Sequence, residues 1–240
     1  NGRPGWHIEC SAMSIKYLGQ SFDIHTGGID HVSVHHENEL AQSMGANSFY
    51  HAQIWMHNEF LTVDNGKMSK SLGNLFTVKD LIDKKYDPIA FRYMVLGAHY
   101  RTKLNFTWEA LEASENALFR LQDLVRDWDK PGVDTCKELE DEFMDAINND
   151  LDTPKTLAIV WKLIDSDFSS SEKAGTLLKF NSILGLSLEN YIAKPLFVSE
   201  EVNVLIKQRA LVRKEKDWKK SDLIRNQIEK LGYLVEDMED

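Results

Sequence analysis

The strongest constraint on the fold is a change in sequence character near residue 100. All eight histidines fall within the first 99 residues, and the chain from residue 101 onward is rich in Leu, Glu, Asp and Lys. Before this point, short strand-like segments alternate with helix-like ones, whereas the later segments show helical periodicity. We therefore predict an α/β part at residues 1–104, followed by an all-α part at residues 105–240.

Residues 1–66 contain two expected helices and three expected extended segments. The helices are at 6–18 and 35–44, and the extended segments are at 21–25, 49–57 and 60–63. Thr26-Gly27-Gly28 is expected to be a loop after the first strand, and Asp64-Asn65-Gly66 a turn after the last. This alternation predicts a layer of strands buried between helices.

The remaining residues show helix start signals. Thr77 with Asp80 resembles a capping box, and Asp87 before Pro88 is typical of an N-cap followed by proline. We expect a long helix from Thr107 to Trp128, with one apolar face that includes Leu111, Leu118 and Leu121. Another helix should start at Thr153-Pro154 by the same cap logic. Two more helices are expected at 200–214 and 217–231, with linkers at 131–132 and 193–198.

Composition bounds the class of protein. The net charge is −10, which does not indicate a nucleic-acid surface, although a local basic patch can sit on an acidic protein. No apolar run approaches the ~20 residues that span a membrane. Two cysteines without a leader segment favour the reducing cytoplasm. Charge alone therefore favours a small-molecule enzyme or a protein partner.

The pentamer Lys67-Met68-Ser69-Lys70-Ser71 follows the expected turn. Two ammonium groups three residues apart, with small hydroxyl residues beside them, can follow a polyphosphate. An arbitrary two-lysine pentamer is more often a solvated loop. This one matches letter for letter the KMSKS signature of class I aminoacyl-tRNA synthetases, and Leu72-Gly73-Asn74 also fits that family.

A second candidate site combines Cys10, His35 and Glu39. His35 and Glu39 are four residues apart on an expected helix, so both side chains should point to the same side. A thiolate, an imidazole and a carboxylate together suit Zn²⁺. Taken alone, the pattern is weak, because a single cysteine is usually a small buried hydrophobe.

The order of motifs resembles the cysteinyl-tRNA synthetase family. The matching segments are Gly5–Ser11, Phe22–Asp30, His35–Glu39, Trp55–Asn58, the KMSKS loop, Ala98–Arg101, Leu104–Phe106, Asn149–Pro154 and Lys219–Arg225. The resemblance covers essentially the whole chain. It implies the second half of a Rossmann-like catalytic domain and a helical-bundle tRNA-binding region.

In that family two cysteines, one histidine and one glutamate hold one zinc ion, and the resemblance assigns Cys10, His35 and Glu39 to three of these positions. The other cysteine and the HIGH motif belong to a segment that precedes Asn1 in the family. We therefore expect a truncated chain that is inactive by itself.

The resemblance also implies roles for the other candidate residues. Lys67 and Lys70 would stabilise charge on the ATP phosphates, with Lys70 expected in direct contact. Gly27, Gly28 and Asp30 would lie under the adenylate, where Asp30 could bind the ribose or the substrate ammonium. Trp6 and His25 are expected at the amino-acid pocket, although a buried structural role for Trp6 is about as well supported.

The implied reaction is a cysteine–tRNA ligase reaction in a monomer, with cysteine, ATP–Mg²⁺ and tRNA(Cys) as substrates. Two alternatives remain open: the cysteine ligase of mycothiol biosynthesis and a non-catalytic tRNA-binding fragment. Contact with tRNA is expected in the helical part, where the basic residues are densest: Lys207, Arg209, Arg213, Lys214, Lys216, Lys219, Lys220 and Arg225.

Overall fold

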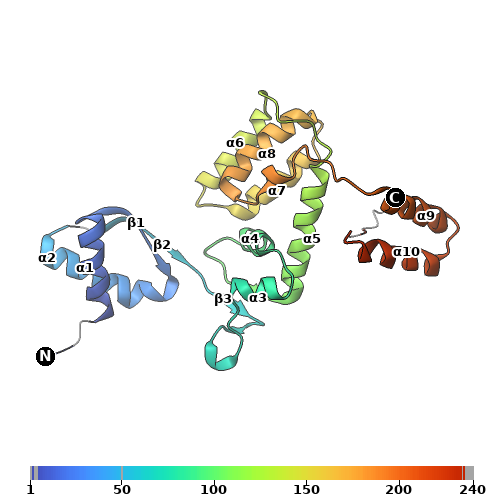
Figure 1. The fold of residues 1–240 in the computed structure, drawn as a ribbon. Coiled ribbons are helices and arrows are strands. Elements are labelled where there is room, and N and C mark those ends of the chain that lie inside the picture. Colours follow the sequence, from blue (N-terminus) through green and yellow to red (C-terminus); the bar gives the residue numbers. More distant parts are fainter. Residues whose placement is uncertain (1, 3–4, 50, 234, 236–240) are drawn as a thin grey trace. The chain divides into compact units, whose positions relative to one another are not determined.

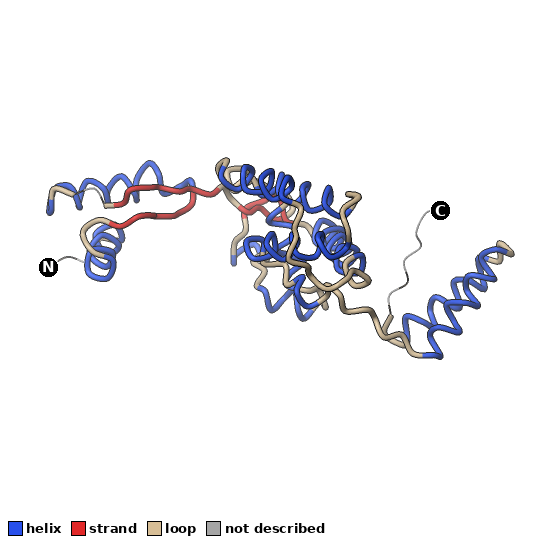
Figure 2. Tube along the Cα trace, turned by 90° about the horizontal axis from the view of Figure 1, so that it is seen from above, coloured by secondary structure: helices blue, strands red, loops and turns tan. Residues whose placement is uncertain are grey.

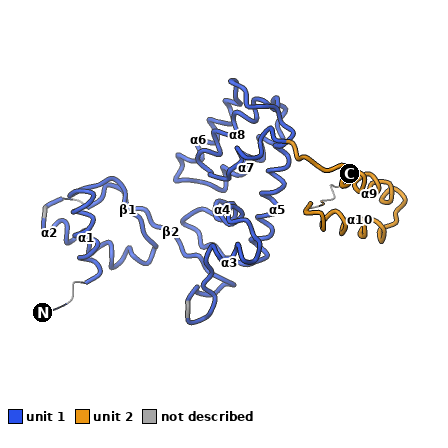
Figure 3. The backbone as a smooth tube through the Cα atoms, viewed as in Figure 1, with its two compact units in different colours: residues 1–194 blue, residues 195–240 orange. Residues whose placement is uncertain are grey.

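The computed structural model describes residues 2, 5–49, 51–233 and 235, and all but two of their side chains. Contacts divide the chain into two compact units, residues 1–194 and 195–240 (Figure 3). The boundary lies within the linker predicted at 193–198, which confirms that linker. No helix in the described part of the chain is long and apolar enough to cross a membrane.

The first unit begins with an α/β lobe. Two parallel strands, β1 and β2, run side by side with Phe22 opposite Ala52 and Gly28 opposite Asn58 (Figures 1 and 2). Helices α1 and α2 pack against each other. The elements are α1 (Trp6–Leu18), β1 (Phe22–Gly28), a 3₁₀ turn (Ile29–His31), a π-helical turn (Val32–His36), α2 (Glu37–Asn47) and β2 (Ala52–Asn58).

The predicted boundaries of β1, β2 and α2 are wrong. Strand β2 begins at Ala52, three residues later than predicted. Gly27 and Gly28 belong to β1 and not to a loop, because they pair with His57 and Asn58 of β2. Ladder pairing with β2 here overrides the low strand propensity of glycine. The α2 helix starts at Glu37, two residues later than predicted, because the preceding turn Val32–His36 is π-helical.

A second, small sheet follows and carries the lysine signature. Its strand order is β4-β3-β5, with β3 antiparallel to β4 and parallel to β5. Strand β5 was not predicted, since three residues are too short for a periodicity signal. The elements are β3 (Leu61–Val63), β4 (Gly66–Lys67), a 3₁₀ turn (Lys70–Leu72) and β5 (Leu104–Phe106).

The rest of the first unit is helical. The predicted capping box of Thr77 and Asp80 and the Asp87 N-cap are confirmed. Two details were wrong: Asp152 caps α7 in place of Thr153, and α5 ends at Leu124. The helices are α3 (Val78–Asp83), α4 (Pro88–Leu96), α5 (Trp108–Leu124), α6 (Lys137–Asn148), α7 (Thr153–Ile164) and α8 (Ser170–Leu184), followed by a 3₁₀ turn (Leu188–Asn190).

A single apolar core holds these helices together. Leu111, Leu118 and Leu121 of α5 are completely buried, as the predicted apolar face of that helix requires. Phe143 of α6 stacks on Phe180 of α8 with ring centroids 4.0 Å apart. Burying side chains of this size contributes about 1.5–3 kcal/mol each. The helical bundle is therefore a stable platform for the lysine loop.

The second unit is a helical pair with its own small core. The two predicted helices are present as α9 (Glu200–Lys214) and α10 (Trp218–Lys230). They pack against each other. The buried residues between them are Val202, Val212, Ile224 and Ile228. The sequence predicts a division of the chain by role, into a catalytic part at residues 1–104 and a tRNA-binding part at residues 105–240. That division stays a prediction.

Asp150 connects two distant parts of the first unit. Its carboxylate accepts hydrogen bonds from the Tyr100 hydroxyl at 2.5 Å and pairs with Arg101 Nε at 2.7 Å. Asp150 and Leu151 both have left-handed backbone, with φ of 58° and 57°. The backbone of Tyr100 in turn accepts a hydrogen bond from the Glu59 amide after β2. This clamp thus connects the α6–α7 loop with the end of the strand region.

We predict that Asp150→Asn weakens the clamp in a pH-dependent way. The Tyr100 hydroxyl and Arg101 hold the pKa of Asp150 below its ordinary value of 3.8. The carboxylate therefore stabilises the fold above pH ~3.8, and this contribution is lost as pH falls through its folded pKa. Asparagine tolerates left-handed backbone, so strain is not introduced. Urea unfolding should separate variant and parent at pH 7 and much less at pH 3; an equal difference at both would contradict the assignment.

Candidate metal and nucleotide site

The α/β lobe is organised around the Glu39 carboxylate, which is completely buried on α2. Its Oε2 atom lies 2.9 Å from His25 Nε2 on β1 and 3.6 Å from His35 Nε2 in the π-helical turn. A buried carboxylate is costly unless it is paired or bound to a metal ion. The hydrogen bond with His25 therefore satisfies one of its oxygens.

Cys10, His35 and Glu39 are brought together as expected. Their ligand atoms lie within 4.8 Å of one another, with Cys10 contributed by α1. The helical spacing of His35 and Glu39 holds even though His35 lies in a π-helical turn. The geometry is that of three ligands around one ion. That they bind a metal stays a prediction.

The sequence indicates His25 as a pocket residue, but it singles out neither His51 nor His57 beside this set. His25, His36 and Glu39 form a second group with ligand atoms within 4.8 Å. His36 Nδ1 lies 2.7 Å from His57 Nε2 of β2, and His7 Nδ1 lies 2.7 Å from His35 Nδ1. The only signal was the crowding of histidines before residue 100, which gives no positions.

One buried carboxylate oxygen in this cluster has no partner. Glu39 Oε1 and His51 Nε2 are both buried and lie 3.9 Å apart, and neither makes a hydrogen bond among the described residues. Unpaired buried polar atoms are rare and often indicate an ion or a water molecule. A cation or a water molecule beside Oε1 would satisfy this oxygen. The thiol, imidazole and carboxylate donors of Cys10, His35 and Glu39 fit Zn²⁺ by their chemistry.

The remaining pocket candidates lie next to the cluster. The Trp6 ring is 57% exposed, so the alternative of a buried structural tryptophan is wrong. The centroids of the Trp6 and His35 rings are 4.1 Å apart. Gly27 is closely approached, because a Cβ there would be 2.6 Å from His36 Cε1. Asp30 is exposed in the 3₁₀ turn that follows β1.

The lysine signature lies on the second sheet. Lys67 ends β4, and Lys70 begins a 3₁₀ turn, while the Lys70 side chain lies outside the described part of the structure. Among the described residues, no hydrogen bond or ion pair joins this loop to the histidine cluster. The two candidate sites are therefore separate groups in this structure.

Comparisons with known proteins agree on one family. The family model described as "tRNA synthetases class I (C) catalytic domain" matches residues 1–116, and "Cysteinyl-tRNA ligase anticodon binding domain" matches residues 198–240. A cysteine–tRNA ligase of Burkholderia lata is 45% identical over 98% of this chain and 50% of its own length. One of Chlamydia abortus is 41% identical over 98% of this chain and 53% of its own length.

The chain belongs to the cysteinyl-tRNA synthetase family. It spans about half the length of the curated relatives that it matches. A LeuRS from Agrobacterium radiobacter K84, solved as a ternary complex with tRNA and LeuAMS, shares the fold. Its TM-score is 0.53 at 16% identity, over 75% of this chain and 29% of that one. These findings confirm the predicted fold class, an α/β part of a class I synthetase followed by helices.

Burial tunes the protonation of the synthetase cluster. It raises the pKa of the Cys10 thiol above 9.0, and the Glu39 carboxylate raises it further. It also lowers the pKa of His36 from 6.5 to about 4 and lowers that of His35, His51 and His57. These four imidazoles are therefore neutral at pH 7 and keep lone pairs for a metal, whereas the thiol needs a cation to ionise.

We predict that Gly27→Ala distorts the cluster. The new Cβ would lie 2.6 Å from His36 Cε1 and 2.8 Å from His31 Nδ1, and buried His36 has little room to move. Overpacking of this kind should lower the free energy of unfolding by about 1–3 kcal/mol. Gly45→Ala on α2 is the matched control, because its Cβ would meet nothing within 4 Å. Equal urea midpoints for the two variants would contradict the prediction.

Proposed function

We propose that this chain belongs to a cysteine–tRNA ligase, which activates cysteine with ATP and transfers it to tRNA(Cys). The observation that carries the proposal is the convergence of the Cys10, His35 and Glu39 ligand atoms within 4.8 Å. The named relatives support it, since they are cysteine–tRNA ligases. The anticodon-binding family match favours it over a cysteine ligase that acts on an amino sugar.

Cys10, His35 and Glu39 are proposed to hold one zinc ion. When bound, Zn²⁺ would supply an open coordination position that takes a thiolate in preference to a hydroxyl. Cysteine and serine differ by one atom, and shape alone separates such pairs poorly. Neutral His35 and buried Glu39 meet the requirements of such ligands, while His25 orients Glu39 through its 2.9 Å contact.

In the proposed first reaction, a carboxylate oxygen of cysteine attacks the α-phosphorus of ATP–Mg²⁺. A phosphorus–oxygen bond forms, the bond to the bridging oxygen breaks, and pyrophosphate leaves with its electron pair. Lys67 and Lys70 are proposed to stabilise the charge that develops on the phosphate oxygens. In the second reaction, a ribose hydroxyl of the tRNA displaces AMP from the carbonyl carbon.

The walls of the substrate site are proposed from the same lobe. Trp6 and His25 would face the amino acid, and close approach of backbone to nucleotide is easiest at Gly27 and Gly28. Asp30 is exposed and free to bind either the ribose or the substrate ammonium group. Monomeric state and cytoplasmic location complete the proposal.

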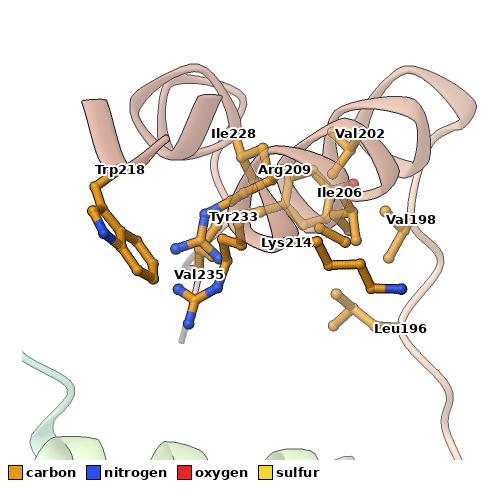
Figure 4. A pocket seen from close by; sticks show the side chains of 12 residues that line it. Leu196, Val198, Val202, Ile206, Arg209, Lys214, Trp218, Ile228, Tyr233 and Val235 are labelled. Atoms are coloured by element: carbon orange, nitrogen blue, oxygen red, sulfur yellow. The ribbon is translucent and has the colours of Figure 1, made fainter. Parts of the chain in front are cut away.

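The second unit is proposed to contact tRNA. It contains a pocket of about 600 Å³ lined by Arg209, Arg213, Lys214, Trp218 and Tyr233, among others. Figure 4 shows Trp218 at one end of this pocket and Leu196 and Val198 at the other. Aromatic rings beside basic groups suit unpaired bases and their phosphates. A locally basic pocket reconciles tRNA binding with the overall charge of −10.

Zinc binding is tested by Cys10→Ala. Loss of a thiolate ligand should weaken zinc affinity at least tenfold in equilibrium dialysis at pH 7. Cys136→Ala is the matched control, because Cys136 is buried in the helical core and away from the cluster. Identical zinc affinity in the two variants would exclude Cys10 as a ligand.

The role of Lys70 is tested by Lys70→Ala in the protein at its full natural length, by cysteine-dependent ATP–pyrophosphate exchange. We expect turnover to fall about 10²–10³-fold with little change in the cysteine KM, because the interaction strengthens in the transition state. Lys137→Ala, an exposed lysine on α6, should leave exchange unchanged. A raised cysteine KM at unaltered turnover would show that Lys70 acts in ground-state binding.

A further inference from the structure

The loop that carries the lysine signature is closed by a residue outside the pentamer. After the 3₁₀ turn Lys70–Leu72, Gly73 adopts left-handed backbone with φ of 68°. This conformation is readily available to glycine and reverses the chain direction. Asn74 is thereby returned to the start of the loop.

The Asn74 side chain binds the loop backbone at two points. Its Oδ1 atom accepts a hydrogen bond from the Ser69 amide at 2.8 Å, and its Nδ2 atom donates to the Lys67 carbonyl at 3.0 Å. A primary amide supplies both an acceptor and donors, which these two backbone groups require. The two peptide groups on either side of Met68 are therefore held by one side chain.

Met68 anchors the same stretch through apolar contacts. It packs against the core of the first unit and lines a small apolar cavity of about 90 Å³ with Phe76, Leu81 and Phe106. Methionine is flexible enough to fill such an irregular space. Within the loop, the Ser69 hydroxyl also accepts from the Leu72 amide at 3.3 Å. Backbone bonds and an apolar anchor thus act on neighbouring residues.

We infer that Asn74 is a positioning residue that holds the backbone between Lys67 and Lys70 in the conformation needed at the ATP phosphates. The inference rests on the proposed function, since the lysines are its point of action. Asn74 is not proposed to touch the substrate or the reacting atoms. It acts by fixing the backbone from which the Lys67 and Lys70 side chains extend. Small displacements of their ammonium groups would lower the reaction rate steeply.

Hydrogen exchange tests the bonds directly and needs no activity. In Asn74→Ala the Ser69 amide loses its acceptor, so its exchange should become at least tenfold faster. Asn74→Asp keeps an acceptor for Ser69 but loses the donor to Lys67, so protection of the Ser69 amide should remain. Unchanged Ser69 exchange in Asn74→Ala, with the rest of the chain folded, would overturn the inference.

Exchange of pyrophosphate tests the consequence, measured on the protein at its full natural length. Asn74→Ala should lower turnover about tenfold with unchanged cysteine KM and unchanged melting temperature, a combination that general destabilisation would not produce. Asn203→Ala is the matched control, because its exposed amide also donates to one backbone carbonyl, that of Val198. It should leave turnover as it is.

The outcomes separate the inference from the function on which it rests. Absence of cysteine-dependent exchange in the unaltered protein would contradict the proposed function and, with it, this role of Asn74. Normal exchange in the unaltered protein and equal turnover in Asn74→Ala would contradict the role of Asn74 alone. Reduced turnover accompanied by loss of Ser69 protection would establish it.

Discussion

The burial of the Glu39 carboxylate is the constraint on which the α/β lobe depends. No part of Glu39 is exposed, and an uncompensated charge there would cost several kcal/mol. Three separate segments supply partners: β1 with His25, the π-helical turn with His35, and α1 with the nearby Cys10 thiol. The π-helical turn has a local purpose in this arrangement, since it places His35 beside the carboxylate. Folding of the lobe thus places the Glu39 carboxylate next to its neighbours His25, His35 and Cys10.

The lysine loop is built on a different principle. None of its described side chains is deeply buried. Its shape therefore depends on hydrogen bonds to backbone groups and on one apolar anchor, Met68. The helical core that Met68 contacts supports the loop from within the first unit. Support of this kind is expected where positioned groups stabilise charge.

The helical parts serve as supports for these sites. The core around α5, α6 and α8 carries the second sheet, and the Asp150 clamp connects the α6–α7 loop with the residues that follow β2. The unit at 195–240 has its own core and can be considered separately. Its pocket combines apolar walls with arginine and lysine side chains, which suits a ligand with flat bases and charged phosphates.

The sequence by itself determined the local features. Capping residues Thr77 and Asp87, the apolar face of α5 and the letters of the lysine signature act within a few residues, so they were predictable from spacing. The Cys10–His35–Glu39 set was predictable from residue types together with family resemblance.

Only the tertiary structure decided which distant groups meet. The pairing of His36 with His57 depends on the parallel register of β1 and β2, and the contact of Tyr100 with Asp150 spans 50 residues. The placement of Gly27 and Gly28 within a strand likewise follows from pairing with β2, against their own preference for a loop. Long-range contacts of this kind are set by packing and register, and local propensity carries no information about them.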